Sequence, residues 1–140
     1  MGRIALISGA HDKVAAARQI QHYAEKALKI NPQLADAWYV MGVWNYNVAN
    51  LNFIERAFAN LFFGGLSDGT IPNAIADYKK AIQFDPTYIL YWKDLAVAYN
   101  DNDQKTDAIA ALKTALSFKP RTADDPEHIK EAQELLKKLQ

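Results

Sequence analysis

The sequence contains no cysteine, only six glycines and five prolines, and no excess of charge of either sign. Without cysteine there is no disulfide framework, no thiolate-ligated metal centre and no thiol nucleophile. Sixteen basic and sixteen acidic residues give a formal net charge of zero, whereas non-specific nucleic-acid binding needs an excess of basic charge. We therefore expect no nucleic-acid partner.

Long apolar runs are absent as well. The apolar stretch at residues 4–7 is shorter than the ~7–15 residues of a secretory signal core. No stretch of the sequence reaches the ~18 apolar residues that a membrane-spanning helix requires. Unless a signal or an anchor precedes residue 1, the sequence predicts a cytoplasmic protein.

Catalytic and metal-binding patterns are also lacking. The three histidines, His11, His22 and His128, lie far apart in the sequence, and none has a second histidine four residues away. That spacing is the one that helical zinc sites use. No glycine-rich loop has the phosphate-binding pattern of nucleotide-binding proteins. We expect no catalytic residue, no metal site and no cofactor, and therefore a protein that is not an enzyme.

What the sequence does contain is an internal repeat. The segments at residues 24–32, 78–86 and 112–120 each carry an alanine five residues before a proline, with apolar residues between them. Proline disfavours helix at the residue before it and cannot donate a backbone hydrogen bond, so each segment reads as the end of a helix. The next helix then begins almost at once.

The spacing of two of these prolines identifies the repeat. Pro86 and Pro120 lie 34 residues apart, the period of the tetratricopeptide repeat. Large residues such as Trp92 and small ones such as Ala96 occupy the expected positions between them, and Leu112 is the one departure, at a position that is usually aromatic. The sequence therefore predicts an all-α fold of tetratricopeptide helical hairpins wound into a right-handed superhelix.

The repeat boundaries predict a single domain over residues 1–140. We expect a capping helix at the C-terminus, with Asp125 as its N-cap and Pro126 in its first turn. The expected units are a partial repeat at 1–34, whose first helix is reduced to about residues 2–8, a middle repeat at 35–88 with about 20 extra residues, a regular repeat at 89–122 and the capping helix at 123–140.

A long insert in the middle repeat is unusual, and its residues suggest a family. The matching positions are Gly42, Trp44, Tyr46 and Val48, then Leu51, Glu55 and Arg56 in the insert, then Gly64 and Gly65, and finally the run at 120–125. This pattern resembles the regulator-of-microtubule-dynamics family. The resemblance implies an association with microtubules, organelle membranes and the contact sites between them, and, for at least one member, phospholipid binding by the repeat domain.

In a tetratricopeptide superhelix the first helix of each pair lines the concave face. Val43 and Val97 stand where chaperone-binding domains carry the asparagines of a carboxylate clamp, so that clamp is absent. The leading hypothesis is a non-enzymatic scaffold that holds a protein or peptide segment in this groove, and the alternative is a phospholipid or fatty-acid site. The expected groove residues are Arg3, Leu6, Asp36, Tyr39, Val43, Tyr46, Leu90, Lys93, Val97 and Asn100.

The insert carries a wide apolar face. An exposed apolar face of this kind marks a partner or membrane contact. In the other interpretation the insert extends the preceding helix and closes the core. The residues expected on this face are Phe53, Phe58, Phe62 and Phe63.

The partial first repeat leaves one apolar helix face without a partner. We therefore expect either self-association through Ile4, Leu6 and Ile7 or fraying of this segment.

Overall fold

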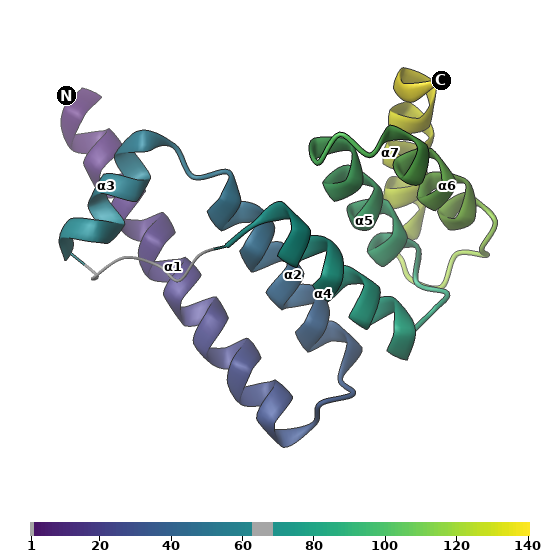
Figure 1. Ribbon diagram of the computed structural model, residues 1–140, viewed down its shortest axis with the longest axis horizontal. Helices are drawn as coiled ribbons and strands as arrows, with labels where there is room; N and C mark the ends of the chain where they lie inside the picture. The colour runs from purple at the N-terminus through teal and green to yellow at the C-terminus, as the bar shows by residue number, and fades with distance from the viewer. Residues whose placement is uncertain (1, 63–68) are drawn as a thin grey trace.

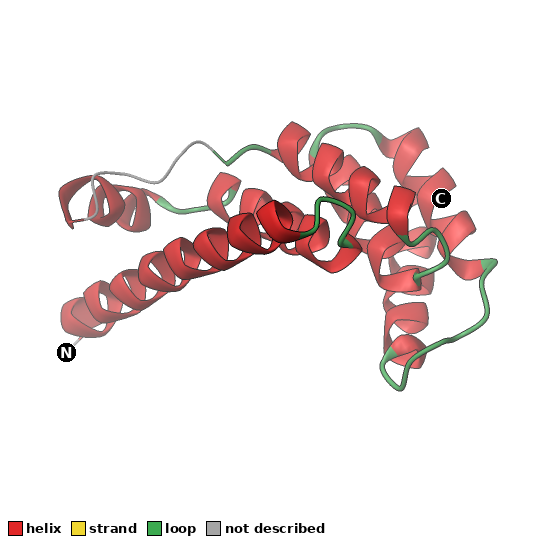
Figure 2. Ribbon diagram, turned by 90° about the horizontal axis from the view of Figure 1, so that it is seen from below, coloured by secondary structure: helices red, strands yellow, loops and turns green. Residues whose placement is uncertain are grey.

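The computed structural model describes residues 2–62 and 69–140, except for the side chains of residues 2–8 and 62. All the regular structure of these residues is α-helical (Figure 2). The expected all-α class is therefore confirmed for the described residues. In chain order the helices are α1 (Gly2–Ile30), α2 (Ala35–Ala49), α3 (Phe53–Phe62), α4 (Ile71–Phe84), α5 (Ile89–Asp101), α6 (Lys105–Leu116) and α7 (Asp125–Leu139).

Two antiparallel helix pairs form the middle of the molecule (Figure 1). In the first pair, α2 packs on α4, and Gly42 of α2 faces the ring of Tyr78 on α4. Gly69, just before α4, lies against Val48 near the end of α2, so the two helices run in opposite directions. In the second pair, α5 packs on α6 across a turn at residues 102–104. Asp103 takes a left-handed conformation there, with φ of 59°.

Both pairs begin with the same local structure. The indole nitrogen of Trp38 donates a hydrogen bond of 2.8 Å to the carbonyl of Pro32, six residues earlier. Trp92 donates an equivalent bond of 2.8 Å to Pro86. In each case the tryptophan in the first turn of a helix satisfies a carbonyl of the turn that precedes it. The sequence repeat therefore corresponds to a repeat in local geometry.

The N-terminal segment differs from the short first helix expected at residues 2–8. A single helix, α1, runs from Gly2 to Ile30. No proline interrupts it, and its one internal glycine, Gly9, costs a helix only ~1 kcal/mol relative to alanine. α1 packs on α2, and its N-terminal half lies beside α3 (Figure 1). Ala10 and Val14 are buried in α1.

The insert forms a helix of its own and does not continue α2. Asn52 and Glu55 make a reciprocal cap at the start of α3: the Glu55 backbone N–H donates to Asn52 Oδ1 at 2.9 Å, and the Asn52 backbone N–H donates to Glu55 Oε1 at 3.0 Å. Glu55 also pairs with Lys13 of α1 at 2.9 Å. Arg56 donates to the carbonyl of Val48 at 3.0 Å. The insert motif thus fixes α3 against α1 and the end of α2.

The last helix, α7, packs on α6 and α5 at the opposite end of the molecule from α1 (Figure 1). Asp125 does not cap α7 as expected. It is the first residue of the helix, and its carboxylate accepts hydrogen bonds from the backbone N–H groups of Arg121 at 2.6 Å and Thr122 at 3.0 Å. The side chain therefore holds the preceding loop against the helix, and it is fully buried.

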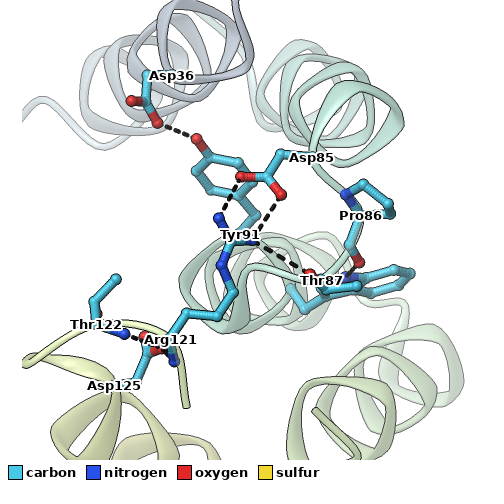
Figure 3. A network of polar contacts seen from close by, with 9 residues as sticks. Asp36, Asp85, Pro86, Thr87, Tyr91, Arg121, Thr122 and Asp125 are labelled. Carbon is cyan, nitrogen blue, oxygen red and sulfur yellow. Dashed lines mark hydrogen bonds and ion pairs between the residues drawn. The ribbon is translucent and has the colours of Figure 1, made fainter. Parts of the chain in front are cut away.

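The loop before α7 also reaches back to the turn between α4 and α5 (Figure 3). The guanidinium group of Arg121 binds both carboxylate oxygens of Asp85, at 2.7 and 3.1 Å, and donates to Thr87 at 3.3 Å. It also lies over the ring of Tyr88, 5.2 Å from the ring centre. The conspicuous run at 120–125 therefore joins consecutive turns.

One buried polar contact lies inside the first helix pair. Asn45 of α2 is 6% exposed, and its side-chain amide donates to the carbonyl of Met41 at 3.2 Å and to the Asp77 carboxylate of α4 at 2.7 Å. Burial raises the pKa of Asp77 to about 6, against the opposing effect of the Asn45 hydrogen bond. The ionised carboxylate is therefore disfavoured in the folded protein.

Replacing Asp77 by asparagine is expected to stabilise the protein at pH 7 by ~1 kcal/mol, which allows for solvent screening of a partly exposed group. The stability that neutral Asp77 contributes is full below its unfolded pKa, ~4, and is lost as the pH rises through its folded pKa of about 6. Asparagine keeps the acceptor for Asn45 and does not ionise. Urea unfolding should show the gain at pH 7 and none at pH 4. A gain of equal size at both pH values would contradict this account. Asp107→Asn, which changes an exposed aspartate in the same way, is the control.

Candidate functional site

A hollow of about 200 Å³ lies where α2 and α5 meet. It brings together four of the residues expected in the groove, which supply its apolar and tyrosine surfaces. Those four are Tyr39, Val43, Tyr46 and Val97, and the remaining lining residues are Asn47, Tyr78 and Asp94. The hollow is open to solvent and apolar on two sides, a shape suited to receiving side chains of another molecule.

The other residues expected in the groove are placed differently. Lys93 is half-buried and pairs with Glu131 of α7 at 2.6 Å and with Asp94 at 3.2 Å. Asp36 is exposed at the start of α2. Leu90 and Asn100 are partly exposed and do not line this hollow.

The side chains of Arg3, Ile4, Leu6 and Ile7 lie outside the described part of the structure. The expected groove contacts of Arg3 and Leu6 therefore stay predictions, as does self-association through Ile4, Leu6 and Ile7.

Three tyrosine–aspartate hydrogen bonds join α2 to α5 along this face. Tyr39 donates to Asp94 at 2.5 Å and Tyr46 donates to Asp101 at 2.5 Å. In the opposite direction, Tyr91 donates to Asp36 (Figure 3). The two partners of every bond are 55 residues apart in the chain. A constant separation means that α2 and α5 run parallel, and we call this row of contacts the tyrosine–aspartate seam.

The tyrosines of the seam stay protonated. Burial, together with the bond to Asp101, raises the pKa of Tyr46 to about 12. Burial also raises the pKa values of Tyr39 and Tyr91, and their aspartate partners add to the effect. Because a neutral hydroxyl donates each bond, the negative charge of the seam is not neutralised.

A second hollow, of about 210 Å³, lies between α1 and α2. Val43 and Asn47 line both hollows, so the two adjoin across α2. Trp44 is 4% exposed, and its indole N–H is buried without a hydrogen-bond partner in the described part of the chain. The lining is mainly apolar, from Ala16, Ala17, Ile20, Trp44, Val48 and Leu51, with Lys13 as the charged member.

The insert presents part of its apolar surface to solvent. Phe53 is 86% exposed and Leu61 is 78% exposed. Phe58 is partly buried, and its ring meets His11 of α1 edge-on, with ring centres 5.6 Å apart. The side chain of Phe62 and the whole of Phe63 lie outside the described residues. α3 thus covers α1 with one face and leaves Phe53 on the other.

The residues that carried the family resemblance have packing and hydrogen-bonding roles here. Gly42 allows the close approach of Tyr78, whose ring carbon would lie 2.5 Å from a Cβ at this position. Trp44 and Val48 are buried in α2, and Tyr46 belongs to the seam. Gly64 and Gly65 lie outside the described residues.

Sequence reasoning missed half of the seam. Asp94, Asp101 and Tyr91 are not among the positions expected on the concave face, and only the structure shows that they face α2. A signal does exist. The equivalent tryptophans of the two helix pairs, Trp38 and Trp92, are 54 residues apart. Tyrosine–aspartate pairs separated by 55 residues, one more than this spacing, include all three bonded pairs.

Neither a metal-binding cluster nor a membrane-spanning helix is present among the residues that the structure describes. No group of three or more histidine, aspartate or glutamate side chains is arranged to hold a metal ion. Likewise, none of the helices described has both the length and the apolar character needed to cross a bilayer.

The structure defines an all-α protein of paired helices with an open hollow lined partly by tyrosines. A family model described as regulator of microtubule dynamics protein 1-3 matches residues 1–140. The chain belongs to this family.

Individual members of the family show how far the similarity extends. Regulator of microtubule dynamics protein 1 from Bos taurus is 29% identical over 140 residues, which cover 98% of this chain and 44% of the relative. Regulator of microtubule dynamics protein 1 from Rattus norvegicus is 30% identical over 127 residues, which cover 89% of this chain and 40% of the relative. Regulator of microtubule dynamics protein 2 from Homo sapiens is 26% identical over 142 aligned positions, which cover 99% of this chain and 34% of the relative. The chain thus spans less than half the length of these relatives.

Proposed function

We propose that this chain is a non-enzymatic binding module of the tetratricopeptide type, which holds a protein segment in the groove along α2 and α5. Two helix pairs with the same tryptophan–proline contact support a tetratricopeptide architecture. The relatives are named as regulators of microtubule dynamics, and we extend to this chain a role in which it binds a protein partner in such regulation.

The observation that carries the proposal is the pair of adjoining hollows on the two sides of Val43 and Asn47. Tyrosine and aliphatic side chains line them, and such surfaces hold alternate side chains of an extended segment. Lys93, which a carboxylate clamp would need free, is already bound to Glu131 and Asp94. The surface therefore favours the side chains of a bound segment over its terminal carboxylate.

A substitution that fills the groove tests this function. Asn47 is exposed and lines both hollows, so Asn47→Trp adds bulk without removing a core contact. We expect peptides selected on the wild-type protein from a random phage-displayed library to bind Asn47→Trp at least about tenfold more weakly in fluorescence anisotropy, as loss of a central contact predicts.

Gln83→Trp adds the same bulk at an exposed position of α4 away from the groove and should leave the affinity unchanged. Equal binding by both variants, or no selection of peptides above background, would reject the groove as a peptide site. Tyr39 is unsuitable for this test because it stacks on Tyr91, with ring centres 5.0 Å apart, and also supports the fold.

A phospholipid or fatty-acid site is the second candidate. The apolar hollow between α1 and α2, lined in part by Trp44, favours this candidate. An acyl chain would occupy the apolar lining. Native mass spectrometry of the gently purified protein tests it. A co-purified lipid that Ile20→Trp excludes would support this function, and a lipid-free protein that ignores liposomes would count against it.

A further inference from the structure

The groove carries uncompensated negative charge. Asp36, Asp94 and Asp101 lie along the tyrosine–aspartate seam, and each accepts its hydrogen bond from a neutral tyrosine. Asp94 is also paired with Lys93 at 3.2 Å. Asp36 and Asp101 are both exposed, and no cation within the described residues lies at ion-pair distance from either. Two carboxylates of the seam are thus free to pair with a cation from outside the chain.

Three cations near the groove already have carboxylate partners, and one of them, Arg121, binds Asp85. Lys93 is held between Asp94 and Glu131, which outweigh the effect of burial and raise its pKa. Lys13, at the edge of the second hollow, is paired with Glu55 at 2.9 Å. Because each of these cations already has a carboxylate partner, an acidic segment would find little attraction here and a basic one would find two open positions.

The spacing of the two open carboxylates sets a length. Asp36 is bonded to Tyr91 near the start of α5, whereas Asp101 is the last residue of α5. The intervening residues of α5 rise by ~15 Å at ~1.5 Å per residue. An extended peptide advances ~3.3 Å per residue and covers this distance in four or five residues. The hollow that contains Val43 and Val97 lies between these two ends.

We propose that the groove recognises a basic extended segment of a protein, with two lysine or arginine residues four or five positions apart and a large apolar residue nearby. The basic side chains pair with Asp36 and Asp101, and the apolar side chain enters the hollows on either side of Val43. This inference rests on the proposed groove function and adds the chemistry of its partner.

Charge-neutral variants of the seam test the inference. Asp36→Asn and Asp101→Asn each keep an oxygen acceptor for the partner tyrosine and remove only the charge. For peptides selected on the wild-type protein from the random phage-displayed library, we expect the double variant to bind about fivefold more weakly, as two exposed ion pairs predict. The affinity of the wild-type protein should also fall between ~50 and ~300 mM NaCl.

Asp107→Asn is the matched control, because Asp107 is an exposed aspartate that likewise accepts a bond from a neutral donor, Gln104, at 2.9 Å. It lies on α6, outside the seam, and should not change the affinity. Circular dichroism and melting curves check that the seam variants stay folded, and the salt dependence of the wild-type protein provides a result that needs no variant.

The outcomes separate this inference from the function on which it rests. Selected peptides that are rich in lysine or arginine, sensitive to salt and weakened by the seam variants would support it. Neutral or acidic peptides that Asn47→Trp excludes would leave the groove function intact and overturn the inference. A library that yields no groove-binding peptide, or a co-purified lipid in place of any peptide, would overturn both.

Discussion

Replacing Asp125 by alanine is expected to lower the free energy of unfolding by about 3 kcal/mol, because two backbone N–H groups lose a charged acceptor and a fully buried side chain leaves a void. The carboxylate is fully buried and accepts from Arg121 and Thr122 at 2.6 and 3.0 Å. Without it, the loop before α7 is no longer held, and α7 packs less firmly on α5 and α6. The melting temperature should fall by about 10 °C, as measured by circular dichroism.

The neighbouring residue supplies the control. Asp124 is exposed and makes no side-chain hydrogen bond to the helix, so Asp124→Ala removes the same charge at the same helix end. We expect a loss below ~1 kcal/mol from the helix dipole. If the two substitutions had equal effects, the hydrogen bonds of the Asp125 carboxylate would not be the cause.

The effect of Asp125→Ala on stability should also depend on pH. Burial acts against the ionised form of Asp125, but the hydrogen bonds from Arg121 and Thr122 outweigh it and lower the pKa of this carboxyl group. A lowered pKa contributes stability that is present above the unfolded pKa, ~4, and is lost as the pH falls through the folded pKa. The difference between the wild-type protein and Asp125→Ala should therefore shrink below pH 4.

Gly42→Val is expected to lower the free energy of unfolding by about 3 kcal/mol, at the upper end of the usual cost of overpacking a core. A Cβ atom on Gly42 would already lie 2.5 and 2.6 Å from two ring carbons of Tyr78. That ring is 3% exposed and lies against the ring of Tyr39, with centres 5.7 Å apart. It cannot swing aside without disturbing α2. Urea unfolding followed by circular dichroism measures the loss.

The second helix pair indicates how the clash can be relieved. The positions equivalent to Gly42 and Tyr78 hold Ala96 and Leu112, both fully buried. Gly42→Ala and Tyr78→Leu should each destabilise the protein, the first by a clash and the second by a void. Their combination should recover about 1–2 kcal/mol relative to the sum. Additive effects within ~0.5 kcal/mol would mean that the two side chains do not compete for the same space.

Much of the fold could be predicted from the sequence because helix ends are marked locally. The prolines at 32, 86 and 120 place the turns, and the tryptophans after the first two place the next helices. α1 could not be predicted correctly, since its continuity through Gly9 is decided by packing against α2 and α3. The insert was ambiguous for a related reason: the contact between Glu55 and Lys13 that fixes α3 joins residues from different helices.

The candidate site was partly predictable. Tyr39, Val43, Tyr46 and Val97, which line one hollow, are all among the residues that the repeat pattern places on the first helix of each pair. The charge of the groove does not follow from that pattern, because Asp94 and Asp101 reach it through their hydrogen bonds to α2. A pattern within one helix gives the face of that helix, whereas the register between two helices depends on contacts that the pattern does not contain.

The three tryptophans of this chain occupy different environments, and this gives the protein built-in optical probes. The indoles of Trp38 and Trp92 are partly exposed and bonded to a turn carbonyl, whereas that of Trp44 is buried beside the second hollow, and its N–H has no hydrogen-bond partner among the described residues. Because indole emission responds to polarity and hydrogen bonding, an occupant of that hollow would alter the emission of Trp44 far more than that of the other two. Variants that keep a single tryptophan can therefore report occupancy of that hollow and the state of each turn separately, without an added label.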